Sequence, residues 1–476
     1  MKKIIFFLFF YTSFIFFFGC SEKIKSQPNV IFILTDDQGY QDLSCYNASN
    51  IYTPNIDFLA NNGARFTSYY ASNPVCSASR ASILTGCYAE RIGVFNAYMP
   101  NSKYGLNPKE TTIAELLKKK KYTTGIFGKW HLGDAPEFLP RQHGFDEFYG
   151  ILYSNDMWPK HPQQGSIFNF SDIYLYENEN RIKTINDQSY LTQQLTEKTI
   201  SFIEKNKEKP FFLLLAHPQP HVPLFVSPSF KGKSKRDLYG DVIQEIDDSV
   251  GQIINTLKTY NLENNTIIIF TSDNGPWLSY GGHSGSAGDF REGKGTNWEG
   301  GHRVPGIVYY PNEIESNTVI NAPAMGIDWL PTIADFTNTP LPKNKIDGLS
   351  LVPLLKKQTT KSPHKNFFFY YRVNELHAIR HNNWKLYLPH TYRSLNGRKG
   401  TNNGIPIKYD MNEIKFSELY NLSNDPSEKN NLATTNQDVV LKIEKIADSI
   451  RYILGDKLKG IKGKEVRPVG ISDFFN

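Results

Sequence analysis

Three short runs of apolar residues mark the first two thirds of the chain. They cover residues 29–35, 210–216 and 266–271, and the first and third lead directly into clusters of polar residues. Apolar runs of this length, with little alternation of polar residues, are typical of parallel strands buried on both faces. They predict the central strands of a sheet that is covered on both sides.

Helix-like segments separate these runs, at residues 112–121, 191–206 and 239–260. In the last segment, apolar side chains recur at helical spacing, at Val242, Ile246, Val250, Ile253 and Leu257. Alternating strands and helices predict an α/β fold with a doubly wound, mostly parallel central sheet flanked by helices. In such sheets, ligands bind beyond the carboxyl ends of the strands.

A different pattern begins near residues 355–364, where a polar stretch interrupts the alternation. Short strands separated by turns follow at residues 366–371, 377–380 and 384–388, and residues 438–453 form an amphipathic pattern. We therefore predict an N-terminal domain over 29–357 and a smaller C-terminal α+β subdomain over 358–476, with an antiparallel sheet and one helix. The tail after Lys459 is expected to be loosely held.

The N-terminus has the pattern of an export signal. Two lysines precede an apolar run over residues 4–18, which at about 15 residues is shorter than the roughly 20 that span a membrane. Gly19-Cys20 resembles a bacterial lipoprotein box, which predicts a signal peptide over 1–19, a linker over 20–28 and lipidation of Cys20. Phe17 stands where that box usually has Leu, so an uncleaved anchor and an ordinary cleaved signal remain alternatives.

All three interpretations of the N-terminus place the folded part of the chain outside the cytoplasm. We expect an exported protein, held to the membrane by a lipid anchor in the periplasm or at the outer membrane or cell surface of a bacterium. Without Cys20, the mature chain keeps three cysteines, Cys45, Cys76 and Cys87. An odd number in an oxidising compartment leaves one thiol unpaired. The sequence leaves open whether Cys45 and Cys87 pair or stay as buried thiols.

Charge adds little to this picture. The net charge of +6 is mild for 476 residues, and the basic clusters at residues 118–121 and 231–236 are typical of solvated faces. No nucleic-acid-binding motif accompanies them, so we expect no nucleic-acid partner.

Polar residues at two strand ends suggest a metal site. Asp36 and Asp37 follow the first strand, and Asp273 and Asn274 follow the third. Their oxygens are hard ligands suited to Ca²⁺ or Mg²⁺. Each pair alone is also a common turn former before glycine. A further motif, GKWHLG at residues 128–133, places Lys129 and His131 two residues apart, which on an extended segment directs both side chains at one anion.

Cys76 lies in the segment NPVCSASRASILTG, residues 73–86. This segment resembles the maturation signature of the type I sulfatases, a branch of the alkaline phosphatase superfamily: Cys-x-Pro/Ala-x-Arg followed by Thr-Gly. In that family the cysteine is oxidised to formylglycine (3-oxoalanine). The resemblance implies a formylglycine-generating or other sulfatase-maturing enzyme as a partner, and Ala78 in place of the commoner Pro leaves open which one. The simpler interpretation is a helix start with Ser77 or Ser79 near its N-cap.

The resemblance extends over residues 29–355 and implies a full catalytic set in the N-terminal domain. Residue 76, with Asp36, Asp37, Asp273 and Asn274, would hold one divalent cation, for which we expect Ca²⁺. The remaining expected catalytic residues are Arg80, Lys129, His131, His221 and Lys294.

Each of these catalytic residues has an expected role. Arg80 holds the aldehyde hydrate, and Lys129 and Lys294 neutralise the sulfate. His221 donates a proton to the leaving alcohol, and His131 acts as the base that regenerates the aldehyde. The neighbouring His217 is expected to be structural.

The implied activity is hydrolysis of sulfate monoesters, with a sulfated polysaccharide or oligosaccharide as the expected substrate. Ser154 matches a serine of the sulfate pocket, and the loop beside it offers candidate sugar contacts at Asn155, Asp156, Trp158 and His161. The sulfate position and the choice between chain ends and interior stay open. The rival functions are a phosphatase or phosphodiesterase of the same superfamily, with a Ser or Thr nucleophile and two Zn²⁺, and a non-catalytic glycan-binding lipoprotein.

Overall fold

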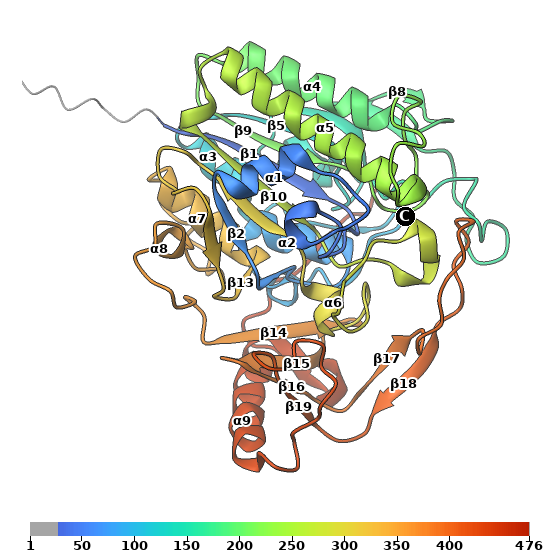
Figure 1. Ribbon diagram of the computed structural model, residues 1–476, viewed down its shortest axis with the longest axis vertical. Helices are drawn as coiled ribbons and strands as arrows, with labels where there is room; N and C mark the ends of the chain where they lie inside the picture. Colours follow the sequence, from blue (N-terminus) through green and yellow to red (C-terminus); the bar gives the residue numbers. More distant parts are fainter. Residues whose placement is uncertain (1–26, 476) are drawn as a thin grey trace, which may run out of the picture.

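The computed structural model describes residues 27–475, and Figure 1 shows a large α/β layer structure above a smaller C-terminal subdomain. The predicted signal peptide and Cys20 lie outside the described residues. No helix in residues 27–475 combines the length and apolar character needed to cross a bilayer.

A ten-stranded mixed sheet forms the centre of the large domain. Its five middle strands run parallel, in the order β10, β1, β9, β5, β6, and the strands outside them add antiparallel pairs at both edges. From one edge to the other the strands are β12 (Thr318–Ile320), β2 (Ala64–Phe66), β11 (Gly306–Tyr309), β10 (Thr266–Ser272), β1 (Asn29–Thr35), β9 (Phe211–Ala216), β5 (Thr123–Lys129), β6 (Glu147–Ile151), β7 (Tyr174–Glu177) and β8 (Asn180–Thr184).

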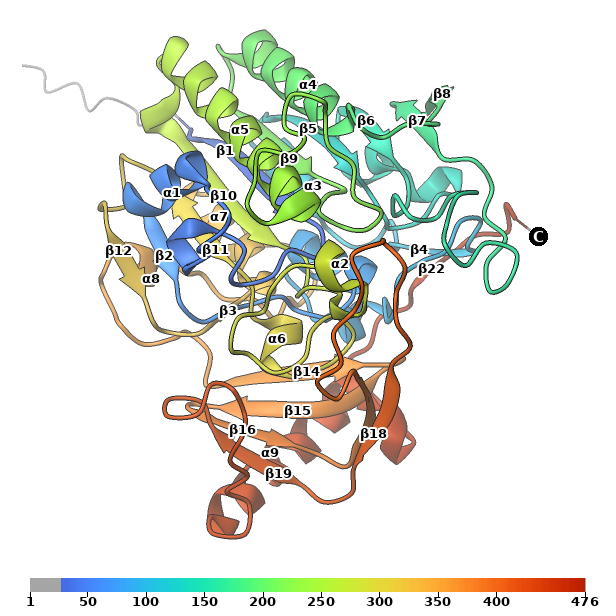
Figure 2. The same cartoon turned by 45° about the vertical axis from the view of Figure 1, so that its right-hand side comes forward.

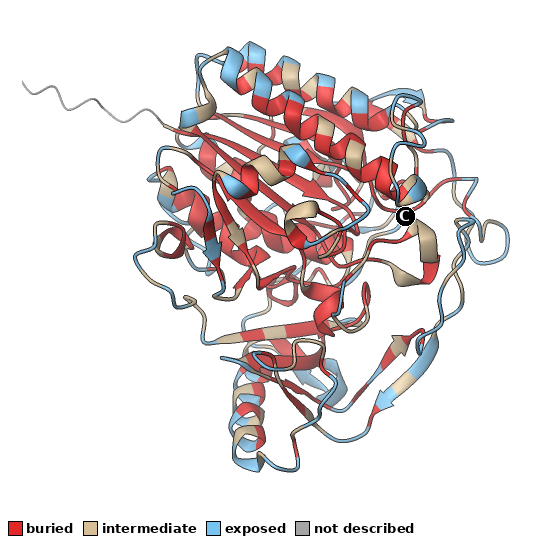
Figure 3. Cartoon of the chain, viewed as in Figure 1, coloured by how far each residue is buried: buried red, intermediate tan, exposed pale blue. Residues whose placement is uncertain are grey.

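Helices cover both faces of this sheet, as the apolar strands predicted (Figure 3). Alternate residues of β1 point to opposite sides, so Phe32 packs into one hydrophobic core and Ile33 into the other. One core includes α2 (Cys76–Thr85), α3 (Ile113–Lys118), α7 (Trp329–Phe336) and α8 (Val352–Leu355), and the other includes α1 (Pro54–Asn61), α4 (Leu191–Asn206) and α5 (Asp237–Thr259). The predicted fold class is confirmed.

The C-terminal subdomain has its own sheet and helix. Its four antiparallel strands are β14 (Asn366–Tyr371), β15 (Glu375–His381), β16 (Trp384–Tyr387) and β19 (Glu418–Asn421), beside helix α9 (Gln437–Leu454). A two-stranded hairpin, β17 (His390–Ser394) and β18 (Asp410–Ile414), carries a long loop at residues 395–409 toward the large domain (Figure 2). The short helix α6 (Glu299–His302) lies between the large domain and this subdomain (Figure 1).

Short two-stranded pairs complete the structure. They are β3 (Tyr69–Tyr70) with β13 (Ala324–Met325), β20 (Gly455–Asp456) with β21 (Ile461–Lys462), and β4 (Tyr104–Gly105) with β22 (Gly470–Ile471).

The tail after Lys459 differs from its expectation, because it packs against the large domain. Arg467 forms an ion pair with Glu110, at 2.7 Å, and its backbone N–H donates to the carbonyl of Arg91. Strand β22 then pairs with β4. A polar sequence with few apolar residues gave no sign of these long-range contacts.

Cys45 and Cys87 both have free thiols, which decides the question that the sequence left open. Burial raises the pKa of the Cys87 thiol to about 11, with the Arg467 guanidinium 3.3 Å away.

Candidate active site

The polar residues that follow β1 and β10 meet because these strands are neighbours in the sheet. Thr35 and Ser272 stand side by side in the register, so the next residues of both strands leave the sheet at the same edge. The backbone N–H of Asp37 donates to Asp273 Oδ1 at 3.2 Å, and Asn274 Nδ2 donates to Asp37 Oδ1 at 2.7 Å. The predicted cluster of oxygen ligands therefore exists.

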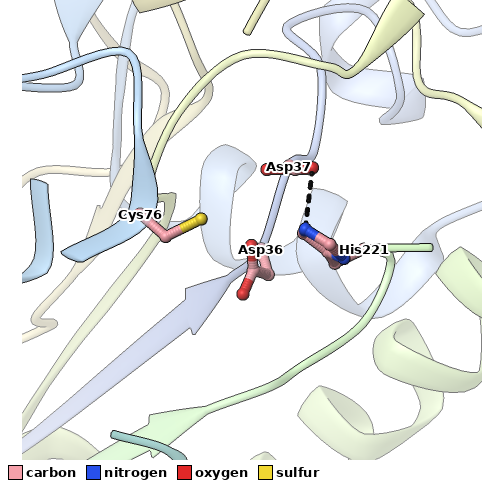
Figure 4. A group of neighbouring side chains, drawn as sticks. All are labelled: Asp36, Asp37, Cys76 and His221. Carbon is pink, nitrogen blue, oxygen red and sulfur yellow. Dashed lines mark ion pairs between the residues drawn. The ribbon is translucent and has the colours of Figure 1, made fainter. Parts of the chain in front are cut away.

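Cys76 is the first residue of α2, and it faces this cluster (Figure 4). The predicted helix start is present, with Val75 as the N-cap and Ser77 as the second helical residue, and no side chain caps the helix. The Lys294 Nζ lies 3.2 Å from Cys76 Sγ. Burial raises the pKa of the thiol to about 12, so the unmodified side chain is a protonated thiol at neutral pH.

Four residues bring ligand atoms within 4.8 Å of one another: Asp36, Asp37, Cys76 and His221 (Figure 4). Three buried oxygens around them accept no hydrogen bond from the residues described: Asp36 Oδ1, Asp37 Oδ2 and Asn274 Oδ1. Buried oxygens normally have partners. A hard divalent cation would complete all three, so these residues fit the expected metal.

Asp273 and Arg80 support this set from outside it. Arg80 donates from Nε to Asp273 Oδ2 at 2.9 Å, from Nη2 to Asp36 Oδ2 at 3.0 Å and from Nη1 to the carbonyl of Lys129 at 2.9 Å. All of its hydrogen bonds found within residues 27–475 go to these three acceptors, and none goes to Cys76. Arg80 thus fixes the carboxylates of Asp36 and Asp273, and its expected contact with the aldehyde hydrate at residue 76 stays a prediction.

Two buried lysines balance the carboxylates. Lys129 forms an ion pair with Asp36 and lies 3.2 Å from Ser154 Oγ, and Lys294 pairs with Asp37 at 2.6 Å. Burial works against ionisation of Asp36, but Lys129 and Arg80 hold its pKa well below the usual range. Burial raises the pKa of Asp37.

Burial and neighbouring charges also shift the pKa values of Asp273 and Lys294. Burial, together with the charge of Asp36, raises the pKa of Asp273 to about 6. Burial opposes the charge of Lys294, yet Asp37 raises its pKa well above 10.5, so Lys294 stays a cation.

The two expected catalytic histidines have different tautomers. Nε2 of His131 lies 2.9 Å from the carbonyl of Tyr98, which can only accept, so Nε2 carries the proton and Nδ1 has a free lone pair. In His221 the proton is on Nδ1, because Nδ1 lies 2.5 Å from the carbonyl of Val222. Its Nε2 faces Asp37 Oδ2 at 3.5 Å. Burial lowers the pKa of both rings, that of His221 to about 4 with help from Lys294.

The GKWHLG segment is not extended throughout. Strand β5 ends at Lys129, and His131 has a left-handed backbone with φ of 63°. The argument from alternation along a strand is therefore wrong for His131, although Lys129 lies in the site. His217 is fully buried, and neither ring nitrogen has a hydrogen-bond partner among the described residues.

The loop after β6 divides into two groups. Ser154 enters the site, because its Oγ also lies 3.5 Å from His221 Nε2, and Asn155 donates to the carbonyls of His221 and Pro223. Trp158 and His161 are 5% exposed; Trp158 packs against Phe225 of the loop after β9, and His161 against Phe168 and Phe170 of its own loop. Asp156 lies 3.8 Å from His161. Sugar contacts by these residues stay a prediction.

Two residues of the site were not found from the sequence. The ring of Trp277 lies 4.8 Å from Lys294 Nζ and packs edge-on against His221. An aromatic residue shortly after the Asp273-Asn274 pair was a signal available in the sequence. Arg393 of β17 donates to the backbone carbonyl of Lys294, and no motif or periodicity in the sequence pointed to this residue.

Comparisons with known proteins agree with this geometry. The family model described as Sulfatase matches residues 28–339, and the C-terminal region of aryl-sulfatase matches residues 362–458. A further model, N-sulphoglucosamine sulphohydrolase, C-terminal, matches residues 293–396.

Human arylsulfatase A is 35% identical over 435 residues, covering 86% of this chain and 84% of that protein. The structure of the sulfatase PsFucS1 from Pseudoalteromonas sp. superposes with a TM-score of 0.78 at 29% identity, covering 89% and 90% of the two chains. The structure of Ps i-CgsB in complex with k-i-k-neocarrahexaose has a TM-score of 0.72 at 31% identity, covering 88% and 92%. The chain therefore belongs to the sulfatase family and is a sulfuric ester hydrolase.

Proposed function

We propose that this sulfatase removes sulfate from a sulfated carbohydrate, through a formylglycine made from Cys76 and with one Ca²⁺ beside it. One observation carries the proposal. A cysteine at the first turn of a helix lies 3.2 Å from a lysine ammonium and within 4.8 Å of two carboxylates and a histidine.

The state of Cys76 supports the modification. A buried thiol with a pKa of about 12 is a poor nucleophile at neutral pH. Formylglycine supplies, as its hydrate, one hydroxyl that attacks sulfur and a second whose deprotonation expels sulfate. A formylglycine-generating or other sulfatase-maturing enzyme is then a necessary partner.

The charges around residue 76 suit a sulfate ester. The ammonium groups of Lys129 and Lys294 and the N-terminus of α2 present positive charge to the ester oxygens, and they are held in place before substrate arrives. Arg80 keeps Asp36 and Asp273 in position.

The cation is assigned to Asp36, Asp37, Asp273 and Asn274 together with residue 76. Three of these residues have a buried oxygen without a partner among residues 27–475. Several protein oxygens in one cluster favour Ca²⁺, since Mg²⁺ tends to retain its waters. A bound Ca²⁺ supplies charge that offsets the negative oxygens of the ester.

The two histidines are assigned to different proton transfers. Nδ1 of His131 has a free lone pair, which suits a base. Nε2 of His221 points toward Asp37 and Ser154 and carries no proton in this tautomer, so the ring must gain a proton there before it can act as an acid. The Lys294 ammonium, whose pKa is raised, can supply that proton, so the leaving alcohol is protonated from this side.

A carbohydrate substrate is supported by similarity, because Ps i-CgsB has been solved with k-i-k-neocarrahexaose. The export signal and Cys20 support a lipid-anchored protein in the periplasm or at the outer membrane or cell surface. Hydrolysis assays with nitrophenyl sulfate, nitrophenyl phosphate and a panel of sulfated oligosaccharides, combined with elemental analysis, test the proposal. Activity on the phosphate ester with two Zn²⁺ per chain would favour the phosphatase alternative.

A further inference from the structure

A cavity of about 460 Å³ lies where the C-terminal hairpin meets the large domain. One wall comes from the segment after β10, which continues to Lys294, and includes Leu278, Gly281 and Glu292. The other wall comes from the loop between β17 and β18, at residues 395–400 and Asn402. Arg236, at the start of α5, completes the lining.

The two walls are joined by direct contacts. Gly282 N donates to the carbonyl of Thr401 and Ile407 N to that of Ser279, both at 3.0 Å. A Cβ on Gly281 would lie 2.3 Å from the carbonyl carbon of Gly400, so the backbones touch there. The cavity is therefore preformed, which lowers the entropy cost of binding a ligand.

The cavity is adjacent to the catalytic residues. Leu278 directly follows Trp277, whose ring contacts both Lys294 and His221. Glu292 is two residues before Lys294. A sugar bound in this cavity would therefore lie next to the sugar whose sulfate faces residue 76.

The charged side chains of the lining are three basic and one acidic: Arg236, Arg398, Lys399 and Glu292. Arg398 pairs with Asp410 at 2.8 Å, whereas the guanidinium of Arg236 donates to the carbonyls of Gly282 and Ser284 and has no ion pair in the described part of the chain. Lys399 is exposed and has no ion pair within residues 27–475. The acidic Glu292 accepts from Ser394 Oγ at 2.6 Å, and its pKa is raised by burial.

We infer that this cavity binds the sugar unit next to the sulfated one and selects a neighbour that carries an anionic group, a carboxylate or a second sulfate. Lys399 and Arg236 attract the anion, and the amide of Asn402 suits sugar hydroxyls. The inference rests on the proposed carbohydrate substrate.

The test uses three disaccharides that share one sulfated sugar and differ in its neighbour: neutral, a uronic acid, or sulfated. Binding is measured by calorimetry on Cys76→Ala protein, with and without Lys399→Gln or Lys399→Glu, so that turnover is not needed. We expect the anionic neighbours to bind more tightly, and Lys399→Gln to weaken their binding by about 2- to 5-fold, the effect of one exposed charge pair. Lys399→Glu should weaken them further, and the neutral disaccharide should be unaffected.

Lys119→Glu is the matched control, because this exposed lysine lies just before β5, near the amino ends of the parallel strands, whereas the site lies at their carboxyl ends. It should leave all three affinities unchanged. The disaccharides with a uronic acid and with a second sulfate are tested separately. The disaccharide whose affinity falls in Lys399→Glu shows which anion the cavity binds. Equal binding of the neutral and anionic disaccharides, or a loss of affinity in Lys119→Glu as large as in Lys399→Glu, would overturn the inference. Failure of the parent protein to hydrolyse any carbohydrate sulfate while it hydrolyses nitrophenyl sulfate would instead contradict the proposed substrate.

Discussion

Arg393 donates a hydrogen bond from Nε to the backbone carbonyl of Lys294 at 3.1 Å, and a second from Nη2 to the same oxygen. The next residue, Gly295, has a φ of 75°, and a Cβ there would lie 2.3 Å from Arg393 Nη2. A side chain here would displace the guanidinium, and the positive φ itself favours glycine. The C-terminal subdomain thus holds the loop that carries Lys294, which is proposed to be catalytic.

Arg393→Ala should therefore reduce kcat by about 10- to 100-fold, because small displacements of a catalytic group have effects of this size. Arg393→Lys should restore part of the loss, since one hydrogen bond can re-form. The measurement is kcat and KM with nitrophenyl sulfate. Arg372→Ala is the control, because Arg372 is on the same subdomain and contacts Thr391 instead. An equal loss in both variants would argue against positioning of Lys294.

The modification of Cys76 can be read from one tryptic digest. Cleavage after Arg65, Arg80 and Arg91 places Cys45, Cys76 and Cys87 in separate peptides. In protein from its natural host, the peptide of residues 66–80 should be lighter by about 18 Da, the replacement of SH₂ by O. The other two cysteines should react with a thiol reagent and serve as internal controls. An active preparation with only unmodified Cys76 would refute the mechanism.

Removal of the cation should destabilise the protein. A ligand at about 100 times its Kd contributes roughly 2.7 kcal/mol, so a chelator should lower Tm by several degrees and Ca²⁺ should restore it. Elemental analysis should give one Ca²⁺ per chain, and Asp37→Asn should lower both metal content and activity.

A buried carboxylate outside the site separates metal binding from stability. Asp247 accepts hydrogen bonds from the backbone of Asn55 and Ile56 at the start of α1. Asp247→Asn should lower Tm but keep the metal. Full calcium content in Asp37→Asn would contradict the assigned ligands.

The acid role of His221 predicts a dependence on the leaving group. His221→Ala should slow hydrolysis of a sugar sulfate by about 10²- to 10⁴-fold. It should slow nitrophenyl sulfate much less, because nitrophenolate leaves without a proton. The measurement is kcat/KM for both substrates. His217→Ala, four residues earlier in the same loop, should change both alike, and equal slowing of both by His221→Ala would refute the role.

His364 makes stability depend on pH. Its Nε2 lies 2.6 Å from Asp328 Oδ1, and although burial opposes the charge, Asp328 raises its pKa above 6.5. A raised pKa means that this stabilisation is fully present below about pH 6.5 and is lost as the pH rises through the folded-state pKa.

Urea unfolding between pH 5.5 and 8.5, on either side of the ordinary histidine pKa of about 6.5, should show this decline in the parent protein. His364→Gln should flatten it. His381→Gln should keep it, because the pKa of His381 is lowered instead. The same slope in His364→Gln and the parent protein would contradict the assignment.

The sequence by itself determined the elements and most of the chemistry. The apolar runs became β1, β9 and β10 within a residue or two at each end, and the periodic segment became α5, because both patterns depend on local burial of side chains. Cys76 and the residues after β1 and β10 were identified for a similar reason, since each motif is contiguous in the chain.

Only the tertiary structure decided which groups meet. The partners of Arg80, the left-handed turn at His131 and the docking of the tail after Lys459 depend on strand order and on contacts across hundreds of residues. Arg393 reaches Lys294 across 99 positions. Such contacts leave no periodic signal, because periodicity records which face of an element is buried and not what lies against it.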